Sequence, residues 1–207
     1  QRFSDSILEG FRQFAATHVE KAQRLRLLLV GHVNPGLLDQ LRKSGVEVVA
    51  TGALEHAASI RCMAGSDWLL LPTAQGHNAD SLIPGKTFEY LASGRPLWVL
   101  GHSSTEVWRR VSELHAGRLC DPAPKTVAAG LKELVVEWQA GQTPAGCTRE
   151  AVFPYGRDVL AARLSQLMEG VIAEHRQRHG AKRRSKVAAN CREADVGVPR
   201  SCPHESS

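Results

Sequence analysis

The stretch VEVVATGALEHAASIRCMAGSDWLLLP, residues 46–72, has the pattern of a strand, a helix and a second strand. VEVVATG at residues 46–52 and DWLLLP at residues 67–72 are short, nearly continuous apolar runs, which are typical of strands buried on both faces. The residues between them, 54–65, are predicted to form a helix. A helix between two such strands predicts a parallel βαβ unit.

The same alternation of strand and helix continues on both sides of this unit. Further strands are expected at residues 24–31, 96–101 and 118–120, and helices at residues 7–15, 35–45, 84–92, 106–115, 125–139 and 157–175. We therefore predict an α/β fold with a doubly wound, Rossmann-like parallel sheet. Domains of this class normally begin with a strand. Because the first predicted element here is a helix, we expect that a first strand before Gln1 is missing.

The formal net charge of +5 lies entirely in the C-terminal region. Residues 175–207 hold eight Lys or Arg and three Asp or Glu, so the rest of the chain is neutral overall. We expect a folded domain over residues 1–175 and a basic, disordered tail over residues 176–207, because the tail has few large apolar residues. A neutral domain predicts no nucleic-acid partner. For the tail, contact with RNA or a peripheral contact with an anionic membrane surface stays open.

Several classes of protein lack their sequence patterns here. No apolar run approaches the roughly 20 residues that span a bilayer, and the five cysteines show neither CxxC nor zinc-like spacing. Reduced cysteines fit a cytoplasmic protein, with the inner membrane surface as an alternative location. The turn after residue 30 reads GHVNPG rather than GxGxxG, and GxSxG is absent. DSLIPGKT, residues 80–87, lacks the first glycine of a phosphate loop and does not follow a strand directly.

The polar loop at residues 73–83 and the helix after it form the best candidate site. Ligands of open parallel sheets bind beyond the carboxyl ends of the strands, where this loop is expected. A helix that begins at Pro84 or Gly85 would present free backbone N–H groups and its positive dipole end to an anion. Lys86 adds a positive charge in the first turn, which a bound phosphate would explain. Glu89 could accept two hydrogen bonds from a vicinal diol such as ribose, although a plain ion pair with Lys86 fits the spacing equally well.

The segment IPGKTFEYLASGRP, residues 83–96, resembles one found in group 1 (family 4) retaining glycosyltransferases of the GT-B fold. The similarity extends to RLRLLLVG, VVATGALEHAASIRCMAGSDWLLLP, AGRLCDPA and GRDVLAARLSQLM, and covers roughly residues 3–172. That family has two Rossmann-like halves, of which the C-terminal one binds most of the sugar donor. The resemblance therefore implies that this chain is the C-terminal, nucleotide-sugar-binding half, and that its N-terminal partner half is absent.

The resemblance also implies roles for individual residues. Glu89 matches the second Glu of the family's E-x7-E element and would hold the ribose. Lys86 would be the catalytic group, because its charge would stabilise the leaving diphosphate. Gly85 and Thr87 would face the same diphosphate, and the base would lie against the turn after residue 51. The complete set of expected donor-binding residues is Gly52, Leu54, Ser81, Gly85, Lys86, Thr87 and Glu89.

One residue departs from the family pattern, and it leaves the function open. Ser81 stands where the first Glu of the E-x7-E element is expected, so the usual contact with the sugar is changed or lost. The expected reaction is transfer of a sugar from a nucleoside diphosphate to a hydroxyl group with retention, without a metal ion or other cofactor. We expect the isolated chain to be inactive. The alternatives are a nucleotide-sugar-binding module that has lost transfer and a GT-B sugar-nucleotide epimerase.

Overall fold

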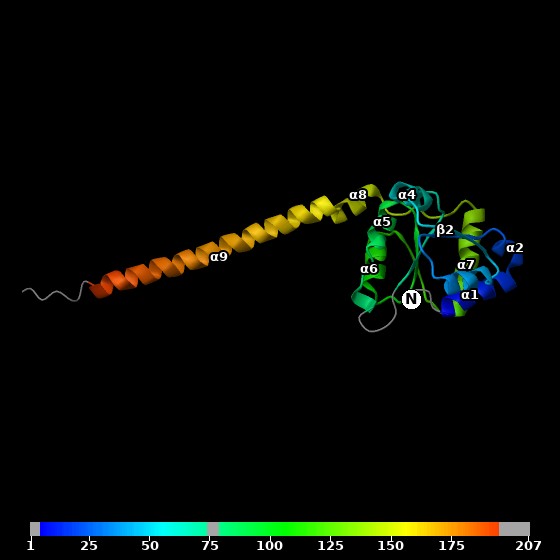
Figure 1. Ribbon diagram of the computed structural model, residues 1–207, viewed down its shortest axis with the longest axis horizontal. Helices are drawn as coiled ribbons and strands as arrows, with labels where there is room; N and C mark the ends of the chain where they lie inside the picture. Colours follow the sequence, from blue (N-terminus) through cyan, green and yellow to red (C-terminus); the bar gives the residue numbers. More distant parts are fainter. Residues whose placement is uncertain (1–4, 74–78, 195–207) are drawn as a thin grey trace, which may run out of the picture. The chain divides into compact units, whose positions relative to one another are not determined.

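The computed structural model of the chain describes residues 5–73 and 79–194. These residues divide into two compact units, Gln1–Pro154 and Tyr155–Ser207. The first unit is an α/β domain, and the second consists almost entirely of one helix (Figure 1). The division lies ahead of this helix and not at residue 175, where the sequence predicts the end of the folded domain.

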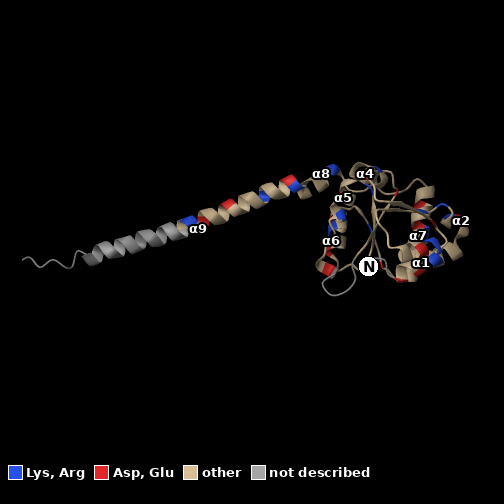
Figure 2. Ribbon diagram, in the orientation of Figure 1, with Lys and Arg blue, Asp and Glu red and all other residues tan. Residues whose placement is uncertain are grey.

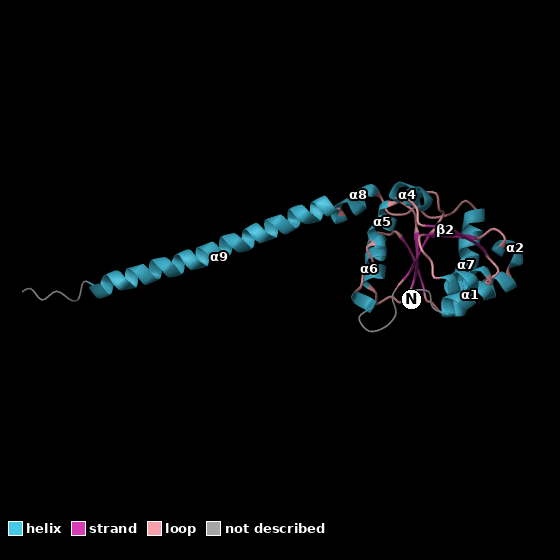
Figure 3. Ribbon diagram, in the orientation of Figure 1, coloured by secondary structure: helices cyan, strands magenta, loops and turns pink. Residues whose placement is uncertain are grey.

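The first unit alternates helices and strands in the order that the sequence predicts (Figure 3). It begins with α1 (Asp5–Thr17), the short α2 (Val19–Ala22) and β1 (Arg26–Val30). The elements that follow are α3 (Pro35–Arg42), β2 (Glu47–Gly52), α4 (His56–Ala64), β3 (Leu69–Pro72), the 3₁₀ turn η1 (Ala79–Ser81), α5 (Lys86–Ala92), β4 (Leu97–Leu100), α6 (Glu106–Glu113), β5 (Gly117–Cys120), α7 (Pro124–Gln139), α8 (Arg149–Val152) and the 3₁₀ turn η2 (Phe153–Tyr155).

Local sequence signals set the beginnings of two helices in this unit. The Asn34 side chain accepts a hydrogen bond from the Leu37 N–H at 3.3 Å, and Pro35 occupies the first turn of α3. Thr105 caps α6 in the same way by accepting from the Trp108 N–H at 3.3 Å. These caps satisfy backbone donors that have no partner inside the helix.

The strands form two parallel sheets rather than one. β1 pairs with β2, starting with Arg26 opposite Glu47. β3, β4 and β5 form a second sheet in that order, in which Leu69 lies opposite Leu97 and Leu97 opposite Gly117. Within the described residues no strand pairing joins β1 to β3. The predicted α/β fold with parallel strands is confirmed, but its strands do not form one continuous sheet.

The core consists of two clusters of buried apolar side chains on opposite faces of β4. Trp98 and Leu100 contribute to the cluster that includes α1 and α7, whereas Leu97 and Val99 contribute to the cluster that includes α5 and α6. Because side chains alternate along a strand, these four residues place one cluster on each face. α1 and α7 pack so closely that a Cβ atom on Gly10 would lie 2.5 Å from the Val127 Cβ. In Figure 2 the ribbons of α1, α6 and α7 carry both basic and acidic residues.

β1 and α4 are less buried than the strands and helices of a doubly wound sheet normally are. No residue of β1 is buried, and Leu28 is 36% exposed. α4 likewise has no buried residue, and Ile60 is 44% exposed. The prediction that residues 24–31 form a strand is confirmed, but the burial on both faces that a doubly wound sheet implies for its strands is not found for this one. The reason is that β1 lies in a two-stranded sheet with no neighbour on the β3 side among the described residues.

The second unit is built on α9 (Arg157–Ala194). This helix continues past residue 175, where the sequence predicts that a disordered tail begins. Residues 176–194 are mainly Arg, Lys and Ala, which favour a helical backbone even without an apolar face. Among the described helices, none combines the length and the apolar character that crossing a bilayer requires. Residues 195–207 lie outside the described part, so the expectation of disorder there stays a prediction.

Candidate functional site

The first turn of α5 lies at the carboxyl end of β3, since this helix follows that strand in a parallel sheet. Pro84 and Gly85 form its start, and their carbonyl groups accept hydrogen bonds from the N–H groups of Thr87 at 2.9 Å and Phe88 at 3.3 Å. The expectation of free N–H groups at this helix start is therefore met only in part. The N–H groups of Gly85 and Lys86 are the ones that have no acceptor among the described residues.

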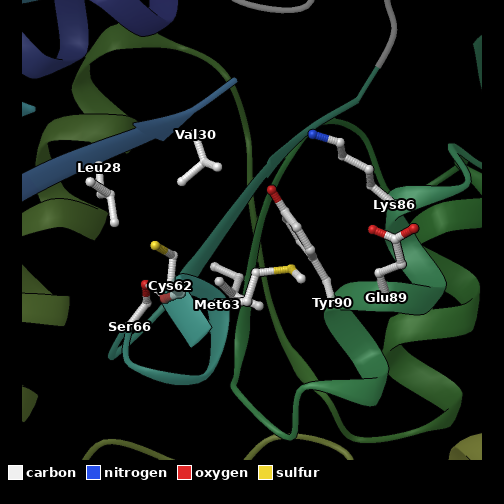
Figure 4. A pocket seen from close by; sticks show the side chains of 9 residues that line it. Leu28, Val30, Cys62, Met63, Ser66, Lys86, Glu89 and Tyr90 are labelled. Atoms are coloured by element: carbon white, nitrogen blue, oxygen red, sulfur yellow. Dashed lines mark hydrogen bonds between the residues drawn. The ribbon is translucent and has the colours of Figure 1, made fainter. Parts of the chain in front are cut away.

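The side chains of Lys86 and Glu89 line the same cavity, which has a volume of about 110 Å³. Both residues are exposed. Figure 4 shows them extending from one turn of α5, with the ring of Tyr90 beside them and directed toward Val30 of β1. The structure thus brings together the two charged residues that the sequence predicts for the diphosphate and the ribose.

Lys86 and Glu89 form no ion pair with each other or with another described residue, and no hydrogen bond joins them in Figure 4. The same i, i+3 spacing does produce an ion pair on α6, where Arg110 and Glu113 lie 2.8 Å apart. The alternative that Lys86 and Glu89 are a plain surface ion pair is therefore not what the structure shows. No described residue neutralises either charge, so both side chains can contact a ligand in the cavity.

The other expected donor-binding residues do not line this cavity. Gly85 is exposed next to Lys86, but the side chain of Thr87 is fully buried, and its hydroxyl has no hydrogen-bond partner among the described residues. Ser81 ends η1, which packs against α6. Gly52 and Leu54 are exposed at and just beyond the end of β2. The cavity alone therefore unites two of the seven expected residues, and a ligand would have to extend past it to reach the others.

Several lining residues carry no functional signal in the sequence. They are the apolar or small residues Leu28 and Val30 of β1, Cys62 and Met63 of α4, Ser66 in the turn after α4, and Leu69 at the start of β3. Tyr90, to which the sequence analysis assigns no role, also lines the cavity and lies one turn after Lys86 on the same side of α5. The cavity has a charged rim on α5 and an apolar floor between β1, α4 and β3.

A second polar group lies at the carboxyl ends of β4 and β5. The His102 Nδ1 and Asp121 Oδ2 atoms are 3.6 Å apart, and both side chains are more than half exposed. Asp121 also accepts a hydrogen bond from the Ala123 N–H at 2.9 Å, which fixes the turn before α7. Among residues 5–73 and 79–194, no group of three or more His, Cys, Asp or Glu side chains is arranged to hold a metal ion.

Comparison with known proteins adds no relative: no protein-family model matches the sequence, and no curated protein matches it either.

Proposed function

We propose that this chain is the donor-binding half of a GT-B glycosyltransferase, which transfers a sugar from a nucleoside diphosphate sugar to an acceptor hydroxyl with retention. The observation that supports this most strongly is the pair Lys86 and Glu89, which line one cavity on α5 without neutralising each other. A cation and a carboxylate one helical turn apart match the two polar parts of a ribonucleoside diphosphate.

Each of the two residues has a distinct task in this proposal. The Lys86 ammonium stabilises the negative charge that develops on the diphosphate as the glycosidic bond breaks. The backbone N–H groups of Gly85 and Lys86 add donors on the same side. The Glu89 carboxylate accepts hydrogen bonds from the two ribose hydroxyls and so orients the donor. Glu89 acts in binding and is neither the acid nor the base of the reaction.

The size of the cavity fits half of a binding cleft. Complete small-molecule sites have volumes of about 300–1,000 Å³, whereas this cavity measures about 110 Å³. The cavity of this chain would therefore contact only part of the donor. The proposed partner is an N-terminal Rossmann-like half, which would close over the donor, exclude water and supply the acceptor site.

A nucleotide-sugar-binding module without transfer activity is the second candidate. It is favoured by Ser81, which replaces the expected Glu and lies on η1 against α6, outside the cavity. Such a module would bind the nucleoside diphosphate as tightly as it binds the complete sugar donor. For either candidate the proposed location is the cytoplasm, where the described cysteines Cys62, Cys120 and Cys147 would stay free thiols.

A thermal-shift screen with UDP, GDP, ADP and their sugar conjugates tests the proposal. A ligand at 100 times its Kd stabilises the folded chain by about 2.7 kcal/mol, which is a readily measured rise in Tm. The proposal expects the nucleoside diphosphate and the sugar conjugate of one base to raise the Tm. The matching nucleoside, which lacks the diphosphate, should raise it less. If no nucleotide shifts the Tm at millimolar concentration, the proposed donor site is wrong.

A further inference from the structure

Residues 157–177, the part of α9 whose side chains the structure describes, carry one apolar stripe. Its large apolar residues recur at intervals of three and four along the helix, so they share one side of it. They are Leu160, Leu164, Leu167, Met168, Val171 and Ile172, all of them exposed. The last four also line a shallow apolar groove on the helix surface. This spacing is typical of a helix that packs lengthwise against another helix.

Among its described residues, the second unit holds no other element that could cover this stripe. The unit begins at the end of the short turn η2, and α9 accounts for every described residue after Gly156. Most of the stability of a helix in a protein comes from packing its apolar face rather than from helix propensity. A partner for the stripe is therefore expected from outside this unit.

The charged residues that border the stripe indicate a second copy of α9 as this partner. Arg163 and Glu174 lie along one edge of the stripe, and Asp158 and Arg176 lie along the other. Each edge thus holds one basic and one acidic residue, near opposite ends of the apolar segment. Two antiparallel copies bring identical edges together. On each edge, the basic residue of one copy then lies near the acidic residue of the other.

One register satisfies the apolar and the charged residues together. When the antiparallel pair is centred on Leu167, Leu164 of one copy lies opposite Val171 of the second copy. In the same register Asp158 of one copy lies opposite Arg176 of the second copy. The charged pair on the other edge is offset by less than one helical turn, which side chains of this length can span. By symmetry each of these contacts occurs twice.

The basic segment that follows the stripe favours the antiparallel orientation over the parallel one. Residues 176–186 hold six Arg or Lys and no Asp or Glu. In a parallel pair the two copies of this segment would lie side by side and repel each other. In an antiparallel pair they extend in opposite directions from the centre, so this repulsion is avoided.

We propose that two copies of this chain associate through an antiparallel pair of α9 helices. The apolar stripes form the centre of the interface, and the Asp158–Arg176 and Arg163–Glu174 pairs form its two edges. Both copies contribute the same residues, as in other interfaces with twofold symmetry. None of these residues lines the cavity on α5, so the interface does not depend on the proposed function.

Analytical ultracentrifugation of the full chain is the first test. The proposal expects a species of twice the 22.5 kDa of one chain, which dissociates on dilution. Leu164→Glu places a charge in the middle of each stripe and should leave only monomer at the same concentration. Its circular dichroism should not change, because Leu164 belongs to neither core cluster. Gln166→Glu is the matched control, since it adds the same charge on the opposite side of α9 and should leave the dimer intact.

Two results of this measurement would overturn the proposal. The first is a wild-type chain that stays monomeric at high micromolar concentration; if Leu164→Glu then also lowers the Tm, the stripe packs on the α/β domain of its own chain. The second is equal dimerisation of Leu164→Glu and Gln166→Glu, which would place the interface outside the stripe.

An exchange of charges tests the orientation of the two helices. Asp158→Arg brings like charges together twice in each dimer and should weaken dimerisation by about tenfold. Adding Arg176→Asp to the same chain should restore it. The two residues lie about 27 Å apart along one helix, so a restored affinity can arise only between copies. If the double variant dimerises as weakly as Asp158→Arg alone, the antiparallel pairing is wrong.

Discussion

Gly101 and Thr73 are in direct contact at the carboxyl ends of β4 and β3. A Cβ atom on Gly101 would lie 2.1 Å from the Thr73 Oγ1 and 3.0 Å from its Cγ2. The Thr73 hydroxyl is buried and donates a hydrogen bond to the Leu100 carbonyl at 3.2 Å. The two residues therefore fix how closely the ends of these strands approach, beside the loop that leads to α5.

Gly101→Ala should destabilise the chain by about 1 to 3 kcal/mol, because the added methyl group overlaps the Thr73 side chain. Thr73→Ala removes both atoms of the closest contacts, so the double variant should be less destabilised than the sum of the single variants. Urea unfolding of the four chains measures this coupling, which should be at least 0.5 kcal/mol. Gly170→Ala on α9, where an added Cβ meets no atom within 4 Å, is the control. Strict additivity would contradict the contact.

The stability of the domain should fall between pH 9 and pH 11 because of Cys120. Burial, with the nearby carboxylate of Asp121, raises the pKa of the Cys120 thiol from 9.0 to about 11. Below pH 9 the thiol is protonated in both the folded and the unfolded chain. Above pH 9 the unfolded chain ionises first, so the free energy of unfolding decreases, by up to about 2 to 3 kcal/mol. Unfolding of the wild type and Cys120→Ala at pH 8 and pH 10.5 should show a smaller decrease in the variant. Equal decreases would contradict the raised pKa.

The positions of helices and strands could be predicted from the sequence because each has a local signal. The apolar run before Gly31, the Pro35 start of α3 and the apolar run before Pro72 are readable without tertiary information. The burial of β1 could not be predicted, because it depends on what lies beside the strand and not on its own residues. The length of α9 could not be predicted either, because the helix propensity of its Arg, Lys and Ala residues leaves no apolar periodicity in the sequence.

The candidate site could be predicted only as far as it depends on charged residues near a helix start. Lys86 and Glu89 could be predicted, because Pro84 and Gly85 indicate the helix start whose first turn contains them. The cavity itself could not be predicted, because its floor consists of apolar residues from three separate elements. The burial of Thr87 could not be predicted either, because the sequence does not indicate which side of α5 packs against the core.

Removal of residues 176–207 should leave the Tm of the remaining chain within one or two degrees of the wild type. The sequence of residues 176–207 holds few large apolar residues that could be buried on folding. Calorimetric scans of the full and shortened chains check this. A loss of several degrees would mean that the C-terminal segment packs on the domain.

The purified chain should transfer no sugar from any nucleotide sugar to an acceptor. A cavity of about 110 Å³ leaves most of a donor open to water, and the proposed acceptor site belongs to the partner half. Product analysis after long incubation with UDP-, GDP- and ADP-sugars is the measurement. Transfer by the isolated chain would show that it is a complete enzyme and not one half.

Calorimetric titration of Lys86 and Glu89 variants tests the central claim most directly. Lys86→Ala should weaken binding of the nucleoside diphosphate by about ten- to a hundredfold, since it removes one charge-assisted contact of about 1.5–3 kcal/mol, and should leave the bare nucleoside nearly unaffected. Glu89→Gln should weaken binding of ribonucleotides but spare a 2′,3′-dideoxy analogue. Because both residues are exposed, neither variant should lower the Tm appreciably. If both variants bind UDP, GDP and their nucleosides as the wild type does, and wild-type binding is measurable, the cavity on α5 is not the donor site.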